Sequence, residues 1–170
     1  MCSSDLTGLR GPIGMWMYSP RMAEHVFPAS TYLRYGVNGE RDQRLTELAI
    51  LTTARELDSQ YEWTAHEPAA RNAGLEEEII ELLRFGRPLA DAGALPGLGA
   101  RERTIIRVAR ELINEPKVSA ETFVEAQTLF GNKGVMDLTG LVGYYTFVNY
   151  TLKTFDLQRT PGSQLLLPLP

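Results

Sequence analysis

Two helical patterns separated by one turn residue constrain this chain more than any other feature. Through residues 41–57 apolar side chains recur at helical spacing, with Leu45, Leu48 and Leu51 on one face. Asp58 follows as the turn, and Ser59 begins a second helical pattern that ends at the breakers in residues 72–74. Because so short a connection makes consecutive helices antiparallel, the sequence predicts a helical hairpin.

The remaining segments are also helical in pattern, and none shows the alternation typical of a strand. Further helices are expected over residues 19–35, 76–85, 101–114, 119–130 and 133–155, with glycine, proline and asparagine between them. The predicted fold class is all-α, a bundle of about six to seven helices built around the hairpin. We expect residues 1–18 to form an irregular N-terminal arm, residues 19–157 one helical domain, and residues 158–170 a C-terminal tail.

Composition narrows the range of partners. The net charge of −4 and the scattered arginines argue against binding to nucleic acid or to an anionic membrane surface. The single cysteine, Cys2, allows no disulfide within the chain. No signal-peptide pattern appears in residues 1–14, and Asp137 and Asn149 interrupt the most apolar segment, which favours a buried helix over a membrane span. A cytoplasmic protein with a small-molecule substrate is expected.

The two ends of the chain carry unusual apolar residues. Trp16 lies in the arm, which we expect to pack as a strap over the body or to serve as a pocket lid. In the tail, Leu165, Leu166 and Leu167 are consecutive between prolines, and three exposed leucines would be unfavourable on a monomer. The tail is therefore predicted to dock on a subunit surface of a homo-oligomer.

Groups able to carry protons gather on the hairpin. Glu62 and His66 are four residues apart on one helix, so their side chains are neighbours, and Ser59 lies three residues before Glu62. Glu47 precedes the turn by eleven residues and His66 follows it by eight, which places them at similar heights in an antiparallel pair. Burial would raise the carboxylate pKa values, and an imidazole with an ordinary pKa of about 6.5 suits acid–base catalysis.

Structural explanations compete with catalytic ones for several of these residues. Ser59 and Glu62 match a capping box, in which both side chains bond to the first turn of the helix. An ion pair with Arg44 or Arg55 would account for Glu47, and His66 could be an ordinary interface histidine. A metal site is not predicted, because one histidine among scattered carboxylates lacks the ligand spacing that zinc requires.

The spacing of these four residues resembles a known pattern. Glu47, eleven residues, Ser59, two residues, Glu62, three residues and His66 is similar to the motif of the alkylhydroperoxidase-D (AhpD-like) and carboxymuconolactone decarboxylase superfamily. The peroxidase branch has cysteine at both middle positions. Here Ser59 and Glu62 fill them, so the dithiol peroxidase cycle is excluded and the cysteine-free decarboxylase branch is the better match.

The resemblance implies an AhpD-like helical fold, assembly into symmetric trimers or hexamers, and a lyase that acts without a cofactor on γ-carboxymuconolactone. His66 would be the general acid, with Glu47 and Glu62 setting its protonation and orientation. Arg44 or Arg34 could hold a substrate carboxylate. Tyr144 and Tyr145 could donate a phenol hydrogen bond or belong to the core. The candidates for contact with the substrate are Ser59, Trp63, Tyr61, Arg44 and Trp16, although the aromatic residues among them are equally consistent with packing.

Three hypotheses follow from this reading. The first is decarboxylase-like proton transfer on a small unsaturated carboxylic acid or lactone. The second is a superfamily enzyme that hydrolyses, hydrates or cyclises an apolar substrate, with no pair of arginines in its pocket. The third is a non-catalytic binding or assembly protein, in which Glu47, Glu62 and His66 would be exposed or too far apart for hydrogen bonds.

Overall fold

The structure is a computed structural model that describes residues 11–157, 159, 162 and 164–168. Cys2 and most of the predicted arm lie outside these residues. The described chain consists of helices joined by turns and contains no strand. The α-helices are α1 (Gly11–Trp16), α2 (Pro20–Tyr35), α3 (Gln43–Glu56), α4 (Gln60–Asn72), α5 (Glu77–Arg84), α6 (Ala100–Asn114) and α7 (Ala120–Thr154), and a 3₁₀ turn covers Leu89–Ala92. The prediction of an all-α fold is confirmed.

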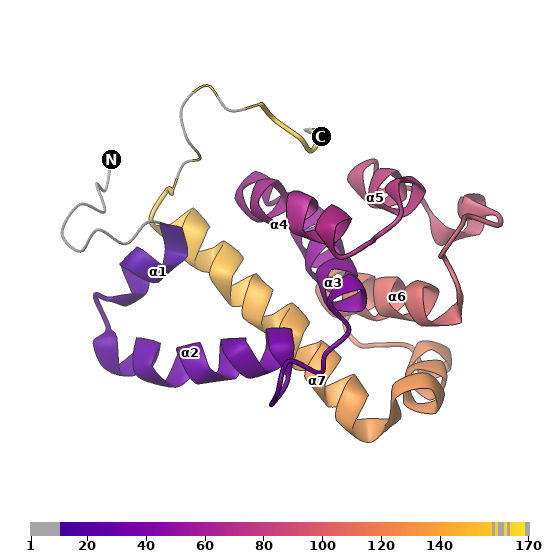
Figure 1. Ribbon diagram of the computed structural model, residues 1–170, viewed down its shortest axis with the longest axis horizontal. Helices are drawn as coiled ribbons and strands as arrows, with labels where there is room; N and C mark the ends of the chain where they lie inside the picture. Colours follow the sequence, from indigo (N-terminus) through magenta and orange to yellow (C-terminus); the bar gives the residue numbers. More distant parts are fainter. Residues whose placement is uncertain (1–10, 158, 160–161, 163, 169–170) are drawn as a thin grey trace.

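The predicted hairpin is the centre of the molecule. Helices α3 and α4 are joined through Asp58, which adopts a left-handed conformation with φ of 49°, a conformation that aspartate tolerates better than most residues. Figure 1 shows α3 in the middle of the fold, with α7 running past it and α5 and α6 on its other side. Leu48 and Leu51 of α3 and Trp63 of α4 are completely buried in the main core. Their burial explains why apolar spacing alone predicted these helices.

The two helices predicted over residues 119–130 and 133–155 are both present as the two halves of α7, which a non-helical residue, Gly131, divides. Helix α7 runs through both segments, and the predicted boundary survives as a kink at Gly131, where φ is 64° and ψ is 174°. Glycine is suited to this conformation because a side chain would be strained there. Ser119 begins the helix as predicted, and its hydroxyl accepts a hydrogen bond from the amide of Thr122.

The predicted irregular arm is wrong over residues 11–16, which form the short helix α1. Trp16 explains why this segment is ordered, since its indole stacks on Phe147 at a centroid distance of 5.3 Å. The indole nitrogen also donates a hydrogen bond of 2.9 Å to Thr151 of α7. Trp16 is buried. Residues 11–16 therefore pack as a strap on α7, which is one of the two roles predicted for the arm.

The C-terminal tail packs partly on its own chain. The side chain of Gln60, at the start of α4, accepts hydrogen bonds from the amides of Leu166 and Leu167 and donates one of 2.6 Å to the carbonyl of Leu167. Leu167 is buried in the main core, whereas Leu165 is exposed. Leu167 thus finds an apolar site in its own chain, while docking of the exposed Leu165 on a neighbouring subunit stays a prediction.

Within the described part of the chain, none of the helices has both the length and the apolar character needed to cross a bilayer.

Candidate active site

The predicted acid–base residues lie together in the interior of the hairpin. Nδ1 of His66 is 2.7 Å from Oε2 of Glu47, which is hydrogen-bonding distance across the two helices. On the other side of the ring, Nε2 is 3.5 Å from Oε2 of Glu62. All three side chains are buried, with 4%, 6% and 8% of Glu47, Glu62 and His66 exposed. The imidazole is therefore held between two carboxylates.

The two nitrogens of His66 differ in how firmly they are held. The short contact to Glu47 fits an Nδ1–H that donates to the carboxylate, which fixes both the ring orientation and the tautomer. The contact to Glu62 is long for a hydrogen bond. Nε2 is therefore the less firmly held of the two ring nitrogens.

The predicted capping box is not formed. Ser59 is the N-cap of α4, but its side chain makes no capping hydrogen bond, and Glu62 does not turn back to the helix start. The carboxylate of Glu62 instead points toward His66. A tertiary partner has replaced the local one, because a buried carboxylate gains more from an imidazole than from an amide that can bond elsewhere.

Burial sets the electrostatics of Glu62. Desolvation raises the pKa of its carboxyl group above the ordinary value, although the charges of His66 and Arg34 oppose this shift. Glu62 thus holds a proton more readily than an exposed glutamate does. A carboxyl group of this kind beside an imidazole suits proton transfer near neutral pH.

Two further groups from other helices complete the surroundings. Tyr145 of α7 packs edge-on against the ring of His66 at 5.0 Å and 87°. Its pKa is raised chiefly by burial, so its hydroxyl stays protonated and able to donate. Arg34 of α2 is near enough for its charge to act on Glu62, Tyr144 and Tyr145.

Arg34 is a cation without an anion. Its guanidinium makes no hydrogen bond or ion pair with any described residue, and its buried Nε has no partner. The side chain lies over the ring of Tyr35 at 5.0 Å, which holds it in place. An unpaired guanidinium beside the cluster is suited to bind the carboxylate of a ligand.

Arg44, the other candidate for binding a carboxylate, is engaged elsewhere. Its guanidinium is 2.7 Å from Glu102 of α6, hydrogen-bonded to Glu76, and 2.9 Å from the carbonyl of Gly97. Arg55 pairs with Asp58. Neither arginine pairs with Glu47, so the predicted ion-pair explanation of Glu47 is wrong, and its partner is His66.

The aromatic candidates pack rather than face the cluster. Trp63 is fully buried in the main core and donates a hydrogen bond of 2.6 Å to Glu67. Tyr61 packs in a second apolar cluster together with Trp16, and burial raises its pKa. These three side chains pack between helices, and the contact of Trp63, Tyr61 and Trp16 with substrate stays a prediction. Ser59 is buried at the start of α4, one turn from Glu62.

Arg34 and Tyr145 lie near the cluster but were not among the candidates for contact with the substrate. Both were considered as donors, but no spacing rule connects α2 or α7 to the hairpin. In the described part of the chain, no three histidine, cysteine, aspartate or glutamate side chains are arranged to hold a metal ion.

The described chain thus combines an all-helical fold with a buried carboxylate–imidazole–carboxylate cluster on its central hairpin. The model of the carboxymuconolactone decarboxylase family matches residues 20–111, more than half of the 170 residues. The chain belongs to the carboxymuconolactone decarboxylase family, whose helical fold is alkylhydroperoxidase-D-like. The matched region includes Arg34, Glu47, Glu62 and His66. Searches of curated proteins and of solved structures found no match.

Proposed function

We propose that the protein is an acid–base enzyme that acts on a small unsaturated carboxylic acid or lactone, in the manner of a carboxymuconolactone decarboxylase. The observation that carries this proposal is the imidazole of His66, whose Nδ1 is hydrogen-bonded to Glu47 and whose Nε2 has only the longer contact to Glu62. A surface or interface histidine would have no need of two buried carboxylates. Their desolvation is unfavourable for folding, so a catalytic use is the better explanation.

The chemistry needs three functions from the protein. When the bond between the substrate carbon and its carboxylate breaks, CO₂ leaves and the electron pair moves into the unsaturated lactone. A proton must then reach carbon, and Nε2 of His66 is the donor in this proposal, with Glu47 stabilising the imidazolium. Glu62 returns a proton to Nε2 for the next turnover. The hydroxyl of Tyr145 donates to the enolate oxygen as negative charge develops there.

The substrate is anchored by Arg34 in this scheme. Its unpaired guanidinium can form a two-pronged contact with one carboxylate. Arg44 is bonded to Glu76 and Glu102, so of the two arginines predicted to hold a carboxylate only Arg34 has no anionic partner among the described residues. A monocarboxylate is therefore a better fit than a dicarboxylate. This single arginine also supports the second candidate function, in which the same cluster hydrates, hydrolyses or cyclises a more apolar substrate.

The burial of the cluster weighs against a purely structural protein. Glu47 and His66 are within hydrogen-bonding reach and neither is exposed, which is the opposite of what a non-catalytic scaffold requires. Homo-oligomeric assembly and a cytoplasmic location stay predictions of the sequence.

The decisive experiment follows turnover of γ-carboxymuconolactone, generated in situ, by ultraviolet absorbance. Wild type is compared with His66→Gln and with His25→Gln, which changes the other histidine of the chain, an exposed residue on α2. We expect His66→Gln to lose at least about a hundredfold in kcat and His25→Gln to retain full activity. Equal activity of His66→Gln and wild type would refute the role of His66.

The outcome with wild type also separates the two candidate functions. Turnover establishes the decarboxylase activity. If wild type does not act on this lactone, monocarboxylic lactones and unsaturated monocarboxylic acids are tested next, with Arg34→Gln expected to raise KM and Arg21→Gln, an exposed change on the same helix, expected to leave it unchanged. If Arg34→Gln has the KM of wild type for every substrate that is turned over, the anchoring role of Arg34 is refuted.

A further inference from the structure

A second ligand site lies apart from the acid–base cluster. We propose that the cavity between α3, α6 and α7 binds a small apolar monocarboxylate, with Arg101 as its anchor. The cavity has a volume of about 330 Å³, within the range of small-molecule sites in proteins. Glu47, Glu62 and His66 do not line it. The inference therefore goes beyond the proposed function and does not depend on it.

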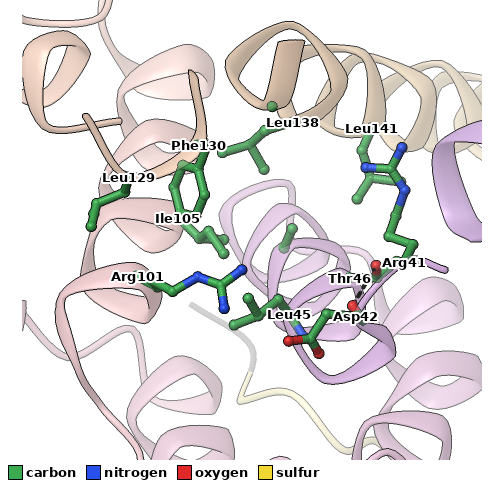
Figure 2. Close-up of a pocket in the computed structure, with 12 residues that line it drawn as sticks. Arg41, Asp42, Leu45, Thr46, Arg101, Ile105, Leu129, Phe130, Leu138 and Leu141 are labelled. Atoms are coloured by element: carbon green, nitrogen blue, oxygen red, sulfur yellow. Dashed lines mark hydrogen bonds between the residues drawn. The ribbon is translucent and has the colours of Figure 1, made fainter. Parts of the chain in front are cut away.

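The wall of the cavity is mainly apolar. Figure 2 shows Leu138 and Leu141 of α7 above the cavity, Phe130 and Ile105 on one side, and Leu45 of α3 below. Leu45, Ile105, Leu138 and Leu141 are each less than one-tenth exposed. They come from three helices of the core, so the cavity is formed by rigid elements. Such a wall favours a hydrocarbon or aromatic group.

The polar groups at the cavity are already engaged, with one exception. Asp42 accepts a hydrogen bond from the amide of Leu45 and so caps α3. Arg41 is 3.0 Å from the carboxylate of Asp137. The hydroxyl of Thr46 donates to the carbonyl of Asp42. Each of these side chains has a partner for at least one polar atom, although the buried Nε of Arg41 has none, so they add less demand for a polar ligand than an unpaired side chain does.

Arg101 is the exception. Its guanidinium forms no ion pair or hydrogen bond with a described residue and lies 5.7 Å from the centre of the Phe130 ring. In Figure 2 the side chain extends from α6 across the cavity toward Leu45. Arg41 is neutralised by Asp137, and Asp42 is bound to the amide of Leu45, so Arg101 is the charged group of the lining that has no polar partner among the described residues. This favours an anion beside Arg101.

The two properties together define the ligand. An apolar group fills the cavity, and a carboxylate at one end pairs with Arg101 at the mouth. An uncharged apolar molecule would leave the guanidinium unpaired, and a polyanion would meet the carboxylate of Asp42. A monocarboxylate with a short hydrocarbon chain satisfies both conditions.

Octanoate is a suitable probe, and 1-octanol is its uncharged match. Binding is measured by titration calorimetry, and the site is located from the methyl NMR signals of Leu45, Leu138 and Leu141. We expect octanoate to bind wild type at least about tenfold more tightly than octanol. Arg101→Gln should remove this preference. Arg21→Gln, which changes an exposed arginine outside the cavity, should leave binding unchanged.

Three results would overturn the inference. The first is no binding of octanoate to wild type. The second is equal affinity for octanoate and octanol in wild type, because the role of Arg101 is then lost. The third is loss of binding in Arg34→Gln instead of Arg101→Gln, with methyl shifts away from the cavity, because the ligand then occupies the acid–base site.

Discussion

Replacing either partner of the buried pair Glu47–His66 should destabilise the protein, whereas replacing both should cost less than the sum of the two single changes. In Glu47→Leu the Nδ1–H of His66 loses its acceptor at a position where the side chains are largely buried. A buried donor left unpaired costs about 1–3 kcal/mol. For a chain of this length, about 2 kcal/mol corresponds to a fall of roughly 4–8 °C in Tm.

The complementary change is expected to cost more. In His66→Leu the carboxylates of Glu47 and Glu62 stay buried without the imidazole between them. Breaking one side of a buried charged pair typically costs about 3–5 kcal/mol. The double variant removes both partners and fills the space with apolar groups, an exchange that is often neutral or favourable. The double variant should therefore be more stable than the sum of the single changes predicts, by about 2 kcal/mol or more.

The assay is urea unfolding followed by circular dichroism, at one protein concentration for all four proteins of the cycle. The exposed pair Arg71–Glu77 provides a control cycle, and its coupling should be below about 1 kcal/mol because solvent screens it. Additive effects of Glu47→Leu and His66→Leu, within about 0.5 kcal/mol, would refute the reasoning. The two side chains would then not depend on each other in solution.

Two further predictions concern the same helices. The pKa of Glu62 is raised in the folded state, so its contribution to stability is present at low pH and lost as pH rises through the raised value. Glu62→Gln should therefore gain stability relative to wild type at about pH 8 but not at about pH 4. An equal difference in the free energy of unfolding at both pH values, measured by urea unfolding, would contradict this. Gly131→Ala should lower the free energy of unfolding by about 1–3 kcal/mol, because alanine is strained at φ of 64° and ψ of 174°. Gly143→Ala, in a helical position with open space around it, should be neutral or stabilising by up to about 1 kcal/mol. Equal thermal midpoints for the two variants would contradict the role of the kink.

Local patterns made most of the fold predictable. Apolar spacing and the breakers between segments located α2 to α6 to within a few residues. Helices α4, α5 and α6 each bury apolar residues in the main core, α3 is buried on all sides, and α2 packs mainly in the second cluster. The boundary between the two halves of α7 was also predictable, because glycine and asparagine at residues 131–132 are typical of a helix end. The angle at which the two halves meet depends on their packing and was not predictable.

The acid–base residues were predictable because all three lie on one hairpin. A short turn fixes the heights of Glu47 and His66, and helical spacing fixes Glu62. The partners of single charges were not predictable in this way. Arg44 and Arg34 are both arginines on neighbouring helices, and their different surroundings depend on where α6 and α7 dock.

Competition between local and tertiary bonds explains the error at Ser59 and Glu62. A capping box and a buried contact with His66 require different orientations of the same glutamate, and the sequence contains both signals. Similarly, Trp16 and Trp63 could each serve packing or binding. The hydrogen bonds of their indole nitrogens to Thr151 and Glu67 assign them to packing, and no spacing rule foretells partners so distant in sequence.

The three contacts of Arg44 have a consequence for how the protein opens. One guanidinium joins α3 to Glu76 at the start of α5, to the carbonyl of Gly97, and to Glu102 in α6. Helix α5 has eight residues and is too short to be stable alone. Because it cannot separate without leaving Arg44 partly unpaired, amide hydrogens in α5 should exchange together with those at the start of α6. These segments would form one cooperative unit, although more than a dozen residues of chain without an α-helix separate them.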